Sequence, residues 1–176
     1  MEERWLFVLV PLRAAARVIL WPAVALLATG CGLVPSDPEP PVFGARTEQG
    51  QIVIKIPLCS SDIVRRVEVT DYDDTAHSSP GLVWWASGPN SATTKQGKFT
   101  LWSGSGFEHS APKPSTSAIP KNIDVGYVDP SGDGRDDVFS LKEISRAKLK
   151  QGQYWTANGP KTASQIDAQL SCKSSS

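Results

Sequence analysis

The residues with the clearest potential for chemistry lie in one short acidic stretch, residues 129–137. Oxygen-bearing side chains occur there at the first, third, fifth and ninth positions, which are Asp129, Ser131, Asp133 and Asp137. Ca²⁺ prefers roughly six to eight oxygen ligands in a flexible geometry, so this spacing fits a calcium loop. Asp and Gly also favour ordinary surface turns, because they tolerate left-handed backbone and bond to their own main chain. We expect a turn first and a Ca²⁺ site second.

The stretch resembles the calcium loops of integrin-type repeats, whose pattern is Asp-x-Asn-Gly-Asp-Gly-x-x-Asp. The resemblance implies that the four residues named above hold the ion. Ser131 stands where the pattern has a better ligand, the motif occurs once, and the twelfth position is Ser140 instead of the Glu of an EF-hand. A second acidic turn contains Asp71, Asp73 and Asp74, and we expect it to be solvated.

Catalytic patterns are otherwise missing from the sequence. Ser105 lies between two glycines but not in the G-x-S-x-G spacing of a nucleophile elbow. His77 and His109 do not have the spacing of metal ligands. H-E-x-x-H, P-loop and dinucleotide-binding fingerprints are absent. We therefore expect a protein that is not an enzyme.

Three tryptophans, Trp84, Trp85 and Trp102, are candidates for a binding surface. Trp84 and Trp85 are adjacent in a strand-like stretch, so one of them should point into the core and the other outward. The outward one, together with Trp102, would form an aromatic platform for a glycan or a peptide. The alternative is that all of them pack inside the protein.

The amino-terminal residues have the order of a bacterial export signal. Three arginines within residues 4–17 precede an apolar run over 18–27, and small residues follow. Ala28-Thr29-Gly30-Cys31 resembles the lipobox of bacterial lipoproteins. The resemblance implies that Cys31 carries fatty chains such as palmitate and anchors the chain on the outer face of the cell membrane. Secretion without lipid is one alternative. A membrane-spanning helix is another, but it needs about 20 uninterrupted apolar residues.

The two remaining cysteines, Cys59 and Cys172, form an even number once Cys31 is used for lipid. An exported protein meets an oxidising compartment, so we expect these two to form a disulfide. A catalytic thiol or a metal pair is the alternative, but neither cysteine lies in a C-x-x-C motif.

The sequence divides into a signal peptide (1–30), a lipidated proline-rich tether (31–49), one domain (50–173) and a frayed tail (174–176). Positive and negative side chains balance over the 176 residues. This balance gives no electrostatic reason to expect a nucleic-acid partner. The expected partners are the membrane, through the lipid, and an envelope protein or glycan.

Short strand patterns separated by turn residues dominate the predicted domain. The strongest is Gln51–Pro57, where three isoleucines alternate with other residues as in a half-buried strand. Further strands are expected at 64–70, 81–87, 98–102, 123–128 and 154–157. The pattern predicts a mainly β protein, an antiparallel β-sandwich, with a small half-open barrel as the alternative.

Two later stretches complete the prediction. Thr162-Ala-Ser-Gln165 is a capping box, which predicts a short C-terminal helix. Residues 138–149 fit either a short helix or a strand followed by a turn. Leu149-Lys-Gln-Gly152-Gln-Tyr154 resembles the tyrosine corner of immunoglobulin-like sandwiches, and the resemblance implies that fold.

The functional expectation is a lipid-anchored, non-enzymatic cell-envelope protein that binds an unidentified ligand. The alternative is a small envelope hydrolase that uses the carboxylates of residues 129–137. No cofactor is expected other than the Ca²⁺ discussed above.

Overall fold

The computed structural model describes residues 39–76 and 81–172 of the chain. The predicted signal peptide, Cys31, the first part of the tether, His77 and the tail therefore lie outside the described residues. Within the described residues, no helix has the length and apolar character needed to cross a membrane. The strands belong to a unit that begins at Pro40.

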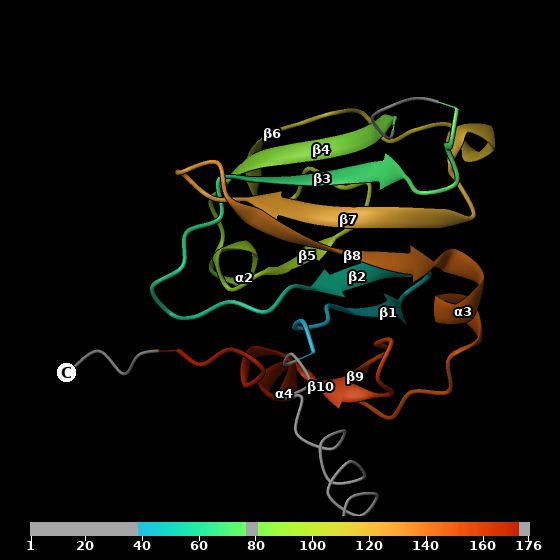
Figure 1. Ribbon diagram of the computed structural model, residues 1–176. Helices are drawn as coiled ribbons and strands as arrows, with labels where there is room; N and C mark the ends of the chain where they lie inside the picture. Colours follow the sequence, from blue (N-terminus) through green and yellow to red (C-terminus); the bar gives the residue numbers. More distant parts are fainter. Residues whose placement is uncertain (1–38, 77–80, 173–176) are drawn as a thin grey trace, which may run out of the picture. The chain divides into compact units, whose positions relative to one another are not determined.

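The larger of the two main sheets has five antiparallel strands in the order β6-β4-β3-β7-β8 (Figure 1). Their bounds are β3 (Arg66–Asp71), β4 (Leu82–Pro89), β6 (Phe107–Ser110), β7 (Asn122–Val128) and β8 (Gly134–Ser140). Alternation decides which side of the sheet each residue faces. In β3, for example, Val67 and Val69 are buried whereas Glu68 between them is only half-buried.

The second sheet has three antiparallel strands in the order β1-β2-β5, which are β1 (Gly44–Glu48), β2 (Gln51–Lys55) and β5 (Lys98–Thr100). Gln49 and Gly50 join β1 to β2 with φ values of 49° and 76°, and two positive φ values are typical of a tight hairpin turn. β1 lies inside the range 31–49 that the sequence assigned to the tether. That prediction is therefore wrong for the end of the range, because Phe43 and Ala45 are buried in the core.

One large hydrophobic cluster lies between the two sheets. Ala45, Ile54 and Phe99 enter it from the three-stranded sheet, and Trp84 and Val125 are among those that enter it from the five-stranded sheet. Two sheets that enclose a shared core form a sandwich. The predicted mainly β, antiparallel sandwich is thus confirmed, while its immunoglobulin-like assignment stays a prediction.

The shorter elements are α2 (Ala92–Lys95), the 3₁₀ turn η1 (Thr116–Ala118), α3 (Leu141–Arg146), β9 (Gln153–Tyr154), β10 (Lys161–Thr162) and α4 (Ala163–Asp167). Residues 138–149, left open by the sequence, form the end of β8 and then α3. The predicted capping box is confirmed at the start of α4, where the Gln165 N–H donates to Thr162 Oγ1 at 3.3 Å and the Thr162 N–H donates to Gln165 Oε1 at 2.8 Å.

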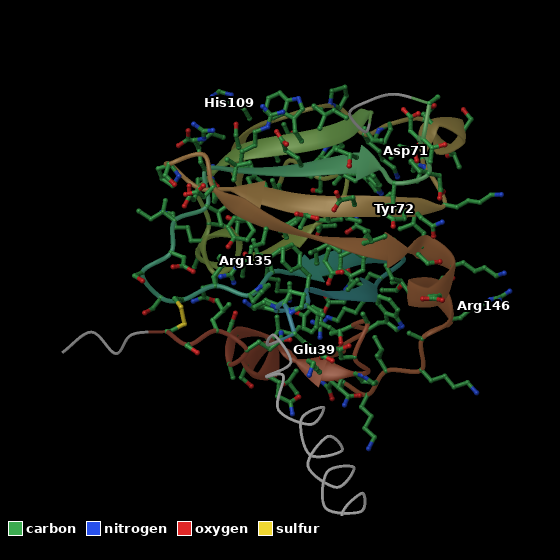
Figure 2. All side chains as sticks on the ribbon, in the orientation of Figure 1. Glu39, Asp71, Tyr72, His109, Arg135 and Arg146 are labelled. Carbon is green, nitrogen blue, oxygen red and sulfur yellow. A yellow bond between two sulfur atoms is a disulfide. The ribbon has the colours of Figure 1, made fainter. Side chains whose placement is uncertain are left out.

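The C-terminal end of the chain is joined covalently to the first half of the fold. Cys59, which follows β2, forms a disulfide with Cys172 beyond α4, and their Cα atoms are 5.5 Å apart (Figure 2). The predicted disulfide is confirmed.

Candidate functional site

The outer faces of the two sheets, meaning the faces away from the main core, differ in what covers them. On the three-stranded sheet, Val53 is buried in a second small cluster with Tyr154 of β9 and Ile166 of α4. The packing is close, because a Cβ atom built on Gly44 would lie only 2.5 Å from Ile166 Cδ1. The chain therefore covers this face with its own C-terminal part (Figure 1).

The outer face of the five-stranded sheet carries exposed or half-buried side chains instead. The residues that point outward from β3 and β7 are all half-buried, and they are Arg66, Glu68, Thr70, Asn122, Asp124, Gly126 and Val128.

A hollow lies in the middle of this face, and we call it the Gly126 hollow. Gly126 of β7 stands in register between Glu68 of β3 and Asp136 of β8, so the central position of that row has no side chain. The resulting space of about 210 Å³ is lined in part by Thr70 and Asp124. A Cβ atom built on Gly126 would meet its neighbours only at 3.5 Å or more, which is ordinary contact. A small side chain at position 126 would therefore fit without a clash.

Two oxygen atoms beside the hollow are buried without a hydrogen-bond partner among the described residues. They are Thr70 Oγ1 and Asp124 Oδ1, which belong to residues that face each other across β3 and β7. A buried acceptor that lacks a donor loses the hydrogen bonds that water gave it, at a cost of about 1–3 kcal/mol.

The carboxylate of Asp124 is also electrostatically perturbed. Burial, which has the largest effect, and repulsion from the carboxylates of Asp136 and Asp137 together raise its pKa from 3.8 to about 6. Like charges that are held close together disfavour ionisation. The hollow therefore contains a carboxyl group with a pKa of about 6, which accepts a proton more readily than an ordinary Asp.

Aromatic and cationic groups lie next to the hollow. The guanidinium carbon of Arg66 lies 4.7 Å from the ring centroid of Trp85, and Arg66 Nε forms an ion pair with Glu68 Oε1 at 2.8 Å. Arg66 thus connects Trp85 to the row that contains Gly126. A cation over an aromatic ring stabilises the arrangement by about 0.5–1 kcal/mol at an exposed site.

The structure separates the three predicted platform tryptophans. Trp84 is fully buried and donates its Nε1–H to the Ala111 carbonyl oxygen at 3.0 Å. Trp102 packs against the main core and meets Trp84 edge-on, with ring centroids 6.1 Å apart. Only Trp85 lies on the outer face, so the predicted platform of Trp85 and Trp102 is not formed.

The first part of the predicted calcium loop is a self-contained turn that joins the end of β7 to the start of β8. Asp129 Oδ1 accepts hydrogen bonds from the backbone N–H groups of Ser131, Gly132 and Asp133 and from the Ser131 hydroxyl. The hydroxyl of Ser131 is the main reason why the pKa of Asp129 is lower than its ordinary value. Asp129 Oδ1 is therefore already occupied by hydrogen bonds within its own turn.

Asp137, the fourth predicted ligand, does not join the other three. It lies four residues beyond Asp133, which is about 13 Å along an extended strand. Its Oδ2 accepts the Phe43 N–H at 2.8 Å and its Oδ1 accepts the Val138 N–H at 2.8 Å. Among residues 39–76 and 81–172, His, Cys, Asp and Glu side chains form no group of three that could hold a metal ion. The predicted four-residue ligand set is thus wrong in geometry.

The second acidic turn was predicted to be solvated, and in the structure Asp73 is exposed whereas Asp71 and Asp74 are half-buried. Asp71 Oδ1 accepts the Asp73 N–H at 2.9 Å, and Asp73 accepts two hydrogen bonds from Asn122.

A cleft of about 590 Å³ lies between the turn at residues 129–134 and residues 61–63.

The sequence did not single out Asp124, Gly126 and Thr70. The alternation in residues 123–128 places Asp124 and Gly126 on the polar side of a strand. This alternation was the only feature of the sequence that pointed to them. Only the pairing of β7 with β3 and β8 shows that they meet Thr70, Glu68 and Asp136.

Comparison of the chain with protein-family models, curated proteins and solved structures finds no match.

Proposed function

We propose that the protein is a lipid-anchored, non-enzymatic protein of the bacterial cell envelope that binds its ligand on the outer face of the five-stranded sheet. The ligand is an envelope protein or a glycan. The observation that carries this proposal is the contrast between the two sheets: one outer face is covered by the chain itself, and the other presents the Gly126 hollow.

The chemistry of the hollow supports binding by hydrogen-bond donors. Three carboxylate residues, Glu68, Asp124 and Asp136, line the hollow and offer acceptors. Sugar hydroxyls, backbone amides and ammonium groups all supply donors of this kind. Trp85 adds an apolar surface beside them, which ligand sites usually combine with a few polar groups.

A hydrolase that uses the carboxylates of residues 129–137 is the weaker alternative. A general acid works best with a pKa near the pH of the reaction. Hydrogen bonds within its turn hold the pKa of Asp129 below its ordinary value, so this carboxylate does not have the environment of a general acid. Burial raises the pKa of Asp137, but both of its oxygens are occupied by backbone N–H groups.

A substitution that fills the Gly126 hollow tests whether the ligand binds on this face. The Gly126→Val substitution places a β-branched side chain in the hollow at a strand position that tolerates it. The matched control is Thr47→Val, which adds valine to an exposed position of the other sheet. Two probes cover the two ligand types: co-sedimentation with purified peptidoglycan sacculi, and photo-crosslinking in cells from a benzoylphenylalanine at Asp136.

We expect one probe to report binding that Gly126→Val reduces at least about tenfold, equivalent to about 1.4 kcal/mol, while Thr47→Val leaves it unchanged. The absence of binding in both arms, or equal binding by Gly126→Val and the wild type, would contradict the proposed face.

The anchor is tested separately by mass spectrometry of the amino-terminal peptide from the membrane fraction. We expect fatty acyl mass on Cys31 and release of a Cys31→Ser variant from that fraction. Two acyl chains anchor stably where one does not, since each buried methylene contributes about 0.8 kcal/mol. A mature chain without acyl mass would overturn the anchor but not the binding face.

A further inference from the structure

The C-terminal segment, residues 161–172, is attached to the sandwich by few contacts. It contains β10, α4 and the residues up to Cys172, and Ile166 is its only buried residue. β10 forms only two residue pairs with β9. A helix of five residues has no stability of its own, because helix nucleation is unfavourable. The segment therefore depends on what ties it to the three-stranded sheet.

The main core does not include this segment. All buried residues of the large cluster lie between Phe43 and Ile144. Ile166 belongs instead to the small cluster with Val53 and Tyr154. If the C-terminal segment detached from the sandwich, the small cluster would be lost and the large cluster would stay intact.

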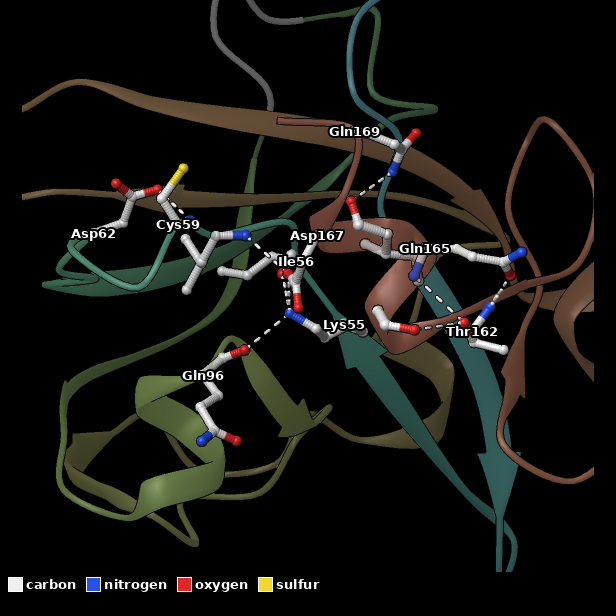
Figure 3. A network of polar contacts seen from close by, with 12 residues as sticks. Lys55, Ile56, Cys59, Asp62, Gln96, Thr162, Gln165, Asp167 and Gln169 are labelled. Carbon is white, nitrogen blue, oxygen red and sulfur yellow. Dashed lines mark hydrogen bonds and ion pairs between the residues drawn. The ribbon is translucent and has the colours of Figure 1, made fainter. Parts of the chain in front are cut away.

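Polar contacts hold the middle of the segment. Lys55 Nζ donates to Asp167 Oδ1 at 2.5 Å, and the same oxygen accepts the Leu58 N–H at 3.1 Å (Figure 3). Lys55 is buried, but the side chain of Asp167 is 39% exposed, so water competes for the carboxylate. Gln169 adds two hydrogen bonds to the backbone of Val42, at 3.2 and 2.9 Å. These contacts are individually weak.

The disulfide is the remaining tie, and a reductant can reach it. Cys172 is exposed, and Cys59 is half-buried in the segment that follows β2. A thiolate can therefore attack the Cys172 sulfur from solvent and form a mixed disulfide.

We propose that the Cys59–Cys172 disulfide is a redox latch that holds the C-terminal segment on the three-stranded sheet, and that reduction releases the segment while the sandwich stays folded. The reductant is a dithiol. Two electrons pass from the dithiol to the protein disulfide, the protein S–S bond breaks, a disulfide forms within the reductant, and the two thiol protons move to Cys59 and Cys172.

Release would uncover a second sheet face. Val53, now packed with Ile166, would then be uncovered beside Tyr154, which would still pack against Gly44. The domain would thus present one open face when oxidised and two when reduced. This inference is independent of ligand binding at the Gly126 hollow.

Hydrogen exchange followed by mass spectrometry tests the latch on the purified protein before and after treatment with dithiothreitol. We expect backbone amides in α4 and the residues up to Cys172 to exchange at least about tenfold faster after reduction, whereas amides of β3, β4 and β7 keep their protection. The double variant Cys59→Ser and Cys172→Ser should show the fast exchange without reductant and should not respond to it.

Two results would overturn the proposal. Unchanged protection of the segment after reduction would mean that the contacts of Lys55 and Ile166 suffice to hold it. Equal loss of protection in β3, β4 and β7 would mean that the disulfide stabilises the whole fold and does not act as a local latch.

Discussion

Replacement of Asp124 by Asn is expected to stabilise the protein at neutral pH. Asparagine keeps the shape of the side chain and removes the charge that burial and the neighbouring carboxylates disfavour. The pKa of Asp124 lies at about 6 instead of 3.8, and each pKa unit corresponds to about 1.36 kcal/mol, so a fully buried group would lose about 3 kcal/mol. Asp124 is half-buried, and solvent screening lowers the expected gain to about 1 kcal/mol.

The gain must depend on pH in a defined direction. The folded state binds the Asp124 proton more tightly than the unfolded state, so the penalty disappears only below the unfolded pKa of 3.8, where both states are protonated. It grows as the pH rises from about 4 to 6 and levels off above that range. The stability gain of the Asp124→Asn variant should therefore be small near pH 4 and near its full size at pH 7.

Urea denaturation followed by tryptophan fluorescence, at several pH values between 4 and 7, measures the free energy of unfolding. Glu143→Gln is the matched control, because it removes one negative charge at an exposed position of α3. The control should change stability by less than about 0.5 kcal/mol at every pH. The reasoning would be refuted if Asp124→Asn gave no gain at pH 7 or the same gain at pH 4.

Three further outcomes are expected. Gly44→Ala should lower the free energy of unfolding by about 1–3 kcal/mol in urea denaturation, because its Cβ would lie 2.5 Å from an atom of Ile166, whereas Gly81→Ala, whose Cβ has its nearest neighbour at 3.4 Å, should change little. Lys55→Met should cost about 1–2 kcal/mol in the oxidised protein, since it leaves buried acceptors without their donor; an unchanged urea midpoint would contradict the ion pair. Millimolar Ca²⁺ should shift the melting temperature by less than about 1 °C, because the turn at residues 129–137 does not gather its predicted ligands, and a rise of several degrees would restore the calcium site.

Local sequence patterns predicted the parts of the fold that depend on local physics. The isoleucine alternation in residues 51–57 predicted β2, and the capping box predicted the start of α4. The strand within residues 107–110 was missed because its stretch is rich in glycine, serine and proline, and its pairing with β4 is a tertiary contact.

The calcium prediction shows that residue spacing within a short stretch does not determine the backbone conformation of that stretch. The spacing of residues 129–137 fits a loop, but the second half of the stretch belongs to β8. Pairing with β7 extends the chain and carries Asp137 to the Phe43 N–H. Whether a stretch is a loop or a strand edge is decided by its partner strand, which the stretch itself does not contain.

The sequence by itself determined the mainly β character, the antiparallel sandwich, the pairing of Cys59 with Cys172 and the short C-terminal helix. Each rests on residue periodicity, on a short-range cap or on the parity of the cysteines. Only the tertiary structure decided that Lys55 is buried beneath α4, that Trp85 faces outward and Trp84 inward, and that Gly126 opens a hollow between Glu68 and Asp136. Those features depend on which strands are neighbours and on what covers each sheet, and such contacts join residues that are far apart in the chain.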